Sequence, residues 1–170
     1  DFSPQATSYW SGRHRDKVFG ANYDAFATKY TGLSACHPDY SDDVMYKSTE
    51  HAIRSAMDAK KPTATFLLLP NWANRSMNPY MHLVNENPEH CTLLGMIPQA
   101  MLSYEKPTAW NGGPPTLSTP TWSMNIIVAW NAAGKEHLHT IAPNWLANLR
   151  SAIRETELVP HCLCYQCSIA

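Results

Sequence analysis

An unbroken apolar run, "TATFLLL", covers residues 63–69 and most strongly constrains how this chain can fold. It lacks the alternation of apolar and polar residues expected of a strand with one wet face, and it is short for a helix. Runs of this kind are typical of strands that are covered on both faces, as in α/β proteins. We therefore predict a central strand over 63–69 that ends in a turn at Pro70-Asn71-Trp72.

Two further apolar runs, over 91–97 and 124–130, predict two more buried strands, the latter a close neighbour of 65–69. Helical patterns occupy the intervals. Ser48-Thr49-Glu50 has the composition of a helix start, so a helix is predicted over 48–59, with a short helix over 78–85 and a last helix between Pro143 and Pro160. This order of helices and strands favours an α/β fold with a largely parallel sheet.

The composition suits a single domain with a real core, because 44% of the 170 residues are hydrophobic and 16% are charged. We expect an α/β domain over 1–160 and a Cys-rich tail over 161–170. The chain begins at Asp1, which indicates either processing or a piece of a longer protein. No apolar run is long enough to predict a membrane span.

The formal net charge of −1 argues against a global basic field that would attract nucleic acid. A nucleic-acid contact would instead depend on a local patch or on stacking, for which six Trp and eight Tyr are present. The Pro- and Gly-rich segment 103–122 contains two of these residues, Trp110 and Trp122. Either they form a binding platform on a loop, or they fold back over a sheet edge.

The five cysteines are too unevenly spaced for a disulfide framework, which favours an intracellular, nuclear or cytoplasmic location. Cys162, Cys164 and Cys167 crowd into the last residues. Cys164 and Cys167 have the spacing of a zinc knuckle, so zinc binding is one hypothesis, and a reduced Cys-rich tail is the other.

Several segments, in order, resemble one enzyme family: "VFGANYDAFATKY", "SACHPDYSDD", "TFLLLPNW", and then a strand, a variable loop and a strand. Over about residues 16–131 the chain is similar to the phosphorylated-CTD-interacting-factor type of adenine-N6 methyltransferase and to the related Dam-like domains. The resemblance implies a Rossmann-like methyltransferase sheet, either complete or truncated, with S-adenosylmethionine as cofactor. It implies cofactor contacts by Phe19, Gly20, Asp24, Phe26 and Ala27, and substrate contacts by Pro70, Trp72, Trp110 and Trp122.

Two signatures of that family are eroded. Its Asn-Pro-Pro-Phe motif, expected just before the helix and near 46–49, is absent there, which leaves Tyr46 and Ser48 as the candidates to hold the base. Its Ser-Pro-Leu-Asn segment, expected after Phe26-Ala27, is replaced by residues 28–30, Thr-Lys-Tyr. We therefore expect weak or no cofactor binding.

Three hypotheses follow. The first is a degenerate, inactive methyltransferase-like domain (a pseudoenzyme) that binds RNA, DNA or a protein partner. The second is an active adenine-N6 methyltransferase with a non-standard motif. The third is a zinc-containing interaction module centred on the tail.

Overall fold

The structure, a computed structural model, describes residues 8–11, 17–18, 20–72, 78–106 and 116–157. Predictions for Phe19, Trp110, Cys162, Cys164 and Cys167 lie outside these residues. The elements are, in chain order, β1 (Trp10–Ser11), β2 (Asn22–Tyr23), the 3-10 helix η2 (Ala25–Ala27), β3 (Gly32–Cys36), α1 (Asp42–Asp58), β4 (Thr63–Asn71), α2 (Tyr80–Glu86), β5 (Cys91–Ile97), the 3-10 helix η3 (Gln99–Met101), β6 (Tyr104–Lys106), β7 (Thr116–Ser118), β8 (Ser123–Trp130), α3 (Ala132–Ile141) and α4 (Trp145–Glu157).

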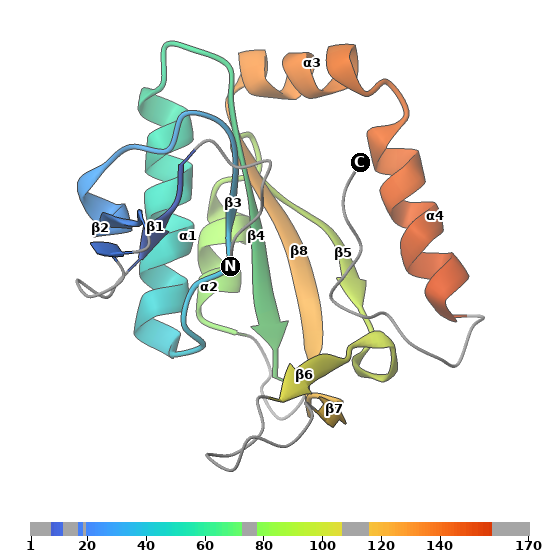
Figure 1. The fold of residues 1–170 in the computed structure, drawn as a ribbon. Helices are drawn as coiled ribbons and strands as arrows, with labels where there is room; N and C mark the ends of the chain where they lie inside the picture. The colour runs from blue at the N-terminus through green and yellow to red at the C-terminus, as the bar shows by residue number, and fades with distance from the viewer. Residues whose placement is uncertain (1–7, 12–16, 19, 73–77, 107–115, 158–170) are drawn as a thin grey trace.

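A four-stranded sheet with the order β3-β4-β8-β5 forms the centre of the molecule (Figure 1). The prediction that 65–69 and 124–130 are buried neighbouring strands is confirmed, since β4 and β8 pair along their length. The prediction of a largely parallel sheet is wrong. β3 and β4 are parallel, but β8 runs antiparallel to both β4 and β5. Burial on both faces produces the same apolar run in either direction, so the sequence pattern does not report direction.

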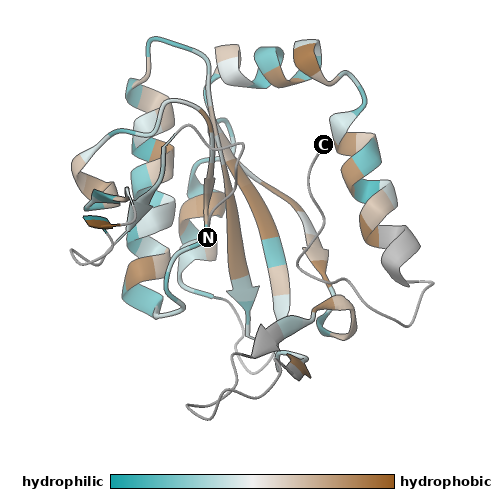
Figure 2. Ribbon diagram, viewed as in Figure 1, coloured by the Kyte–Doolittle hydropathy of each residue, from teal (hydrophilic) through white to brown (hydrophobic). Residues whose placement is uncertain are grey.

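Helices cover both faces of this sheet, which explains why β4 and β8 do not alternate. On one face α1 and α2 enclose a core that includes Leu67, Leu69 and Ile127. On the other face α3 and α4 pack over Val128 and Trp130 (Figure 1). Figure 2 shows the consequence, with hydrophobic residues concentrated on the strands and hydrophilic residues frequent on the helices. No helix in the described ranges has the length and apolar character needed to cross a membrane.

The first long helix begins earlier than predicted, at Asp42 and not near Ser48. Ser41 lies at its N-cap position in extended conformation, and Asp42 and Asp43 place negative charge in the first turn, where the helix dipole favours it. Thr49, predicted to begin the helix, lies inside it and donates a hydrogen bond of 2.9 Å to the Met45 carbonyl. The Ser-Thr-Glu sequence does not cap a helix here, because the Thr49 hydroxyl bonds to the preceding turn of the same helix.

The helix α3, which was not predicted, follows β8 directly, and the side chain of Asn131 bonds to its first turn. The Oδ1 atom of Asn131 caps this helix by accepting hydrogen bonds from the Gly134 amide at 2.7 Å and the Thr63 amide at 3.1 Å. Its Nδ2 atom donates to the carbonyls of Ala59 and Lys61 at 3.1 and 2.9 Å. Asn131 thus joins the start of α3 to the turn between α1 and β4.

Candidate binding site at the carboxyl ends of the parallel strands

Four aromatic side chains meet where β3 and β4 end and β8 begins. The ring of Tyr40 lies edge-on to those of His37, at 5.2 Å between centroids, and Trp122, at 5.7 Å. Trp72 lies 5.1 Å from Trp122. We call His37, Tyr40, Trp72 and Trp122 the loop cluster. Its members come from segments far apart in the sequence, and ligands of open α/β sheets bind at this end of the strands.

Topology brings these segments together. The loop with His37 and Tyr40 follows β3, and Trp72 follows the last residue of β4. Because β8 is antiparallel to β4, its first residue, Ser123, pairs with the last residue of β4, Asn71. Trp122 therefore reaches the same edge from the opposite direction.

The corrected helix start changes which residues lie just before the helix. The segment between β3 and α1 is "HPDYS", so His37-Pro38-Asp39-Tyr40 stands just before the helix, where Asn-Pro-Pro-Phe is expected by resemblance. Residues 46–49, where the motif was sought, lie within α1. There Tyr46 is exposed and Ser48 is fully buried, so the two do not present one surface. His37 and Tyr40 were not predicted as site residues, because their segment contributed only to the family resemblance and to a turn; the Ser41-Asp42-Asp43 cap signal indicates that the helix starts directly after them.

The imidazole of His37 contacts the hydroxyl of Tyr40 through its Nε2 atom. Partial desolvation by its neighbours lowers the pKa of His37 below its ordinary value. The neutral ring is therefore favoured at neutral pH, and a neutral imidazole offers one hydrogen-bond donor and one acceptor.

A buried amide fixes the turn that carries Trp72. Asn78 donates a hydrogen bond of 2.8 Å to the side-chain oxygen of Asn71 and accepts one of 3.3 Å from the backbone amide of Trp72. Asn78 is 3% exposed, so these bonds are shielded from water. Asn78 therefore stabilises the turn that carries Trp72. Pro70, predicted as a substrate contact, is fully buried beside it.

The segment predicted to bind the cofactor lies elsewhere. Gly20 borders a shallow hollow of about 570 Å³ together with Trp10, Lys17, Ala21, Asn22, Tyr23 and Thr28. Asp24 adopts the left-handed conformation, with φ of 60°, and accepts a hydrogen bond of 3.1 Å from the Phe26 amide. Its lining residues belong to β1, β2 and the adjoining segments. Figure 1 shows these strands away from the end of β4. The predicted cofactor and substrate residues thus form two separate groups in this structure.

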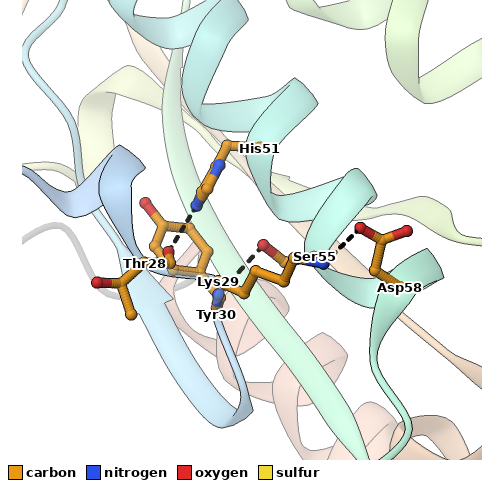
Figure 3. A network of polar contacts seen from close by, with 6 residues as sticks. All are labelled: Thr28, Lys29, Tyr30, His51, Ser55 and Asp58. Atoms are coloured by element: carbon orange, nitrogen blue, oxygen red, sulfur yellow. Dashed lines mark hydrogen bonds and ion pairs between the residues drawn. The ribbon is translucent and has the colours of Figure 1, made fainter.

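The residues after Phe26-Ala27 anchor this segment to α1 (Figure 3). His51 Nε2 donates to the Thr28 carbonyl at 2.8 Å, and the Tyr30 amide donates to Ser55 Oγ at 3.1 Å. The rings of Phe26 and Tyr30 pack edge-on against His51, with centroids 5.7 and 4.6 Å away. Phe26 and its neighbours therefore have a structural role, whereas Ala27 is exposed within η2.

The same segment carries an ion pair of 2.7 Å between Lys29 and Asp58. Where the family's cofactor segment has Ser-Pro-Leu-Asn, this chain has residues 28–30, and these residues attach its N-terminal part to α1. The residues present do not fit a cofactor role at this point.

No protein-family model matches the sequence, and a search of curated proteins finds no match either. Within the described ranges, no group of three or more His, Cys, Asp or Glu side chains is placed to hold a metal ion. The zinc hypothesis for Cys162, Cys164 and Cys167 stays a prediction, since these residues lie outside the described ranges.

Proposed function

We propose that this chain is a degenerate adenine-N6 methyltransferase-like domain that binds an unpaired nucleobase of RNA or DNA at the loop cluster. The observation that carries the proposal is the meeting of Tyr40, Trp72 and Trp122 at the carboxyl ends of β3 and β4. All three rings are half-buried, so each is held in place and still has an accessible part. Stacking of one base on such a ring contributes about 1–3 kcal/mol.

His37 supports recognition of a base edge. It stands at the first position of the segment that replaces Asn-Pro-Pro-Phe, where the family uses an amide oxygen to accept a hydrogen bond from the adenine amino group. Because the Nε2 atom of His37 contacts the Tyr40 hydroxyl, the acceptor open to a base is Nδ1, in the neutral tautomer whose Nε2–H donates to Tyr40. The lowered pKa of His37 favours the neutral ring. In addition, the indole N–H of Trp72 is buried without a hydrogen-bond acceptor in the described part of the chain, so a ligand acceptor would satisfy it.

The net charge of −1 implies that phosphate contacts contribute little to binding. We therefore expect affinity for single-stranded nucleic acid with a shallow dependence on salt. Double-stranded DNA, whose bases are already stacked, is expected to bind less well.

Two tyrosines provide a matched test of the location. Tyr40 belongs to the loop cluster, whereas Tyr46 is an exposed residue of α1, at the place near 46–49 where the sequence predicted the base to be held. In fluorescence anisotropy with a labelled short oligoadenylate, Tyr40→Ala should weaken binding about tenfold, and Tyr46→Ala should leave it unchanged. Equal effects of the two variants, or no binding by the wild-type chain, would refute the proposal.

One observation favours an active enzyme as the second candidate. The segment His37-Pro38-Asp39-Tyr40 keeps proline at the second position and an aromatic ring at the fourth position of the expected motif. The test is transfer of a labelled methyl group from S-adenosylmethionine to oligoadenylate. Incorporation that is lost in Tyr40→Ala and kept in Tyr46→Ala would establish activity at this site.

A further inference from the structure

The hollow at β1 and β2 has the size of a small-molecule site, and we call it the β1–β2 hollow. Its volume of about 570 Å³ lies within the range of roughly 300–1,000 Å³ that is usual for such sites. The Gly20 amide donates a hydrogen bond of 3.0 Å to the Lys17 carbonyl, and Gly20 has a φ of 87°. Glycine adopts this left-handed conformation without strain, so the turn holds Lys17 at the hollow. A further lining residue, Thr28, is held to α1 by the bond between its carbonyl and His51 (Figure 3).

The β1–β2 hollow offers a positive charge to a ligand. Of the described residues that line it, Lys17 alone is charged. The ion pairs within the described ranges involve Lys29 and Arg54 and leave Lys17 unpaired. The carboxylate of Asp24 is not part of the lining and accepts its hydrogen bond from the Phe26 amide. An anionic group in the hollow would therefore meet an ammonium group and no carboxylate from the described lining.

Two partly exposed aromatic residues line the same hollow. Trp10 is 38% exposed and Tyr23 is 49% exposed. Because Trp10 pairs with Asn22 between β1 and β2, the indole ring and the Asn22 amide lie on the same side of this small sheet. The Lys17 ammonium lies 6.0 Å from the centre of the Tyr23 ring. Aromatic surface, an amide and an ammonium group thus border one hollow.

We propose that the β1–β2 hollow binds a nucleotide, with its base against Trp10 and its phosphate paired with Lys17. Stacking holds a base of any sequence, and a lysine is a suitable point charge for a phosphate. S-adenosylmethionine, the cofactor implied by the resemblance, fits this hollow less well, because its net positive charge would be repelled by Lys17. The nucleotide is either a free mononucleotide or the 5′ end of a single strand, since both present the same base and phosphate. The proposal does not rest on base binding at the loop cluster, which is formed by other residues.

The test is isothermal titration calorimetry of the whole chain with AMP and with adenosine, which lacks the phosphate. The wild-type chain should bind AMP at least about tenfold more tightly than adenosine. Lys17→Ala should weaken AMP binding about tenfold and leave adenosine binding unchanged, because it removes only the partner of the phosphate. Trp10→Ala should weaken the binding of both ligands about tenfold, because both carry the base.

Lys135→Ala is the matched control. The Lys135 ammonium lies 5.3 Å from the centre of the Trp130 ring, but on α3, away from β1 and β2 (Figure 1). This variant should bind AMP like the wild type, and circular dichroism establishes that each variant is folded. The proposal would be overturned by a wild-type chain that does not bind AMP, by equal affinities for AMP and adenosine, or by equal effects of Lys17→Ala and Lys135→Ala.

Tyr40→Ala separates this site from the loop cluster and identifies the source of the nucleotide. AMP should bind this variant as it binds the wild type, so a failure of the present proposal can be told apart from a failure of base binding at the loop cluster. A 5′-phosphorylated oligoadenylate that binds Tyr40→Ala more tightly than AMP does would identify a strand as the ligand. Equal or weaker binding of the oligoadenylate would identify a free mononucleotide.

Discussion

The hydroxyl of Tyr80 donates a hydrogen bond of 2.7 Å to the carbonyl oxygen of Pro70. It also accepts one of 3.1 Å from the side-chain amide of Asn125. One fully buried phenol thereby connects α2, the end of β4 and β8. Trp72 follows Pro70 by two residues. The bond from Tyr80 to Pro70 therefore holds the end of β4 from which Trp72 reaches the loop cluster.

Tyr80→Phe should lower the free energy of unfolding by about 1–3 kcal/mol, because it leaves the Pro70 carbonyl and the Asn125 amide without this partner in a buried place. Urea denaturation at neutral pH measures the change. Tyr46→Phe, which removes an exposed hydroxyl, should have almost no effect. If Tyr80→Phe is as stable as the wild type, the hydrogen bonds of Tyr80 do not contribute to the fold.

Replacing Gly134 by alanine should destabilise the protein, although Gly134 lies in a helix. A Cβ atom at this position would come within 2.0 Å of the Thr63 carbonyl oxygen, and backbone cannot give way as a side chain can. Glycine to alanine normally stabilises a helix by about 1 kcal/mol, whereas Gly134→Ala should destabilise this protein by about 3 kcal/mol or more. Thermal and urea denaturation measure the difference.

Gly95→Ala is the control for that substitution. Its Cβ would meet only the flexible end of Ile153 at 3.2 Å, so we expect a change of about 1 kcal/mol or less. Similar losses in the two variants would show that the close approach of α3 to β4 does not determine the cost.

Much of the fold was predictable from the sequence because its central strands are long apolar runs. β4, β5 and β8 were located within about two residues of their observed ends, as the strong pattern allows. Their relative direction was not predictable, since a strand buried on both faces looks the same in either orientation. The helix α3 was missed because its segment, rich in Ala, Gly and His, lacks a strong apolar stripe, although Asn131 gave a cap signal.

The candidate site was less predictable because it depends on residues far apart in the chain. Trp72 and Trp122 were each identified as candidate contacts, but nothing in the sequence indicated that they touch. Tyr40 joins them only because the antiparallel β8 begins where β4 ends. The start of α1 was predicted at residue 48 and lies at Asp42, so the segment just before the helix is 37–41 and residues 46–49 lie inside the helix.

Buried thiol and phenol groups predict a loss of stability in alkali. Burial raises the pKa of Cys91 from its ordinary value of 9.0 to about 12, and that of Tyr80 from 10.0 to about 12. Between the two values the unfolded chain has released a proton that the folded chain retains, so stability falls as pH rises. We expect a stable plateau below pH 9 and then a fall of about 1.4 kcal/mol per pH unit for each group.

Urea denaturation at a series of pH values measures this fall. In Cys91→Ala the fall between pH 9 and 10 should be shallower than in the wild type, and the part that remains there comes from Cys36, whose pKa burial also raises above 9.0. An unchanged slope in that variant would show that the Cys91 thiol does not ionise on unfolding in this range.

The last prediction is that S-adenosylmethionine binds weakly or not at all. The residues after Phe26-Ala27 would have to face a cofactor, but Thr28 and Tyr30 are bonded through their backbones to α1, and Lys29 is paired with Asp58 (Figure 3). Freeing them would break these contacts before any ligand contact formed, and that cost reduces affinity. Isothermal titration calorimetry measures it directly. His51→Ala, which removes the bond to the Thr28 carbonyl, should loosen the segment without creating a cofactor site, and micromolar binding by the wild type would contradict the degenerate interpretation and favour the active enzyme.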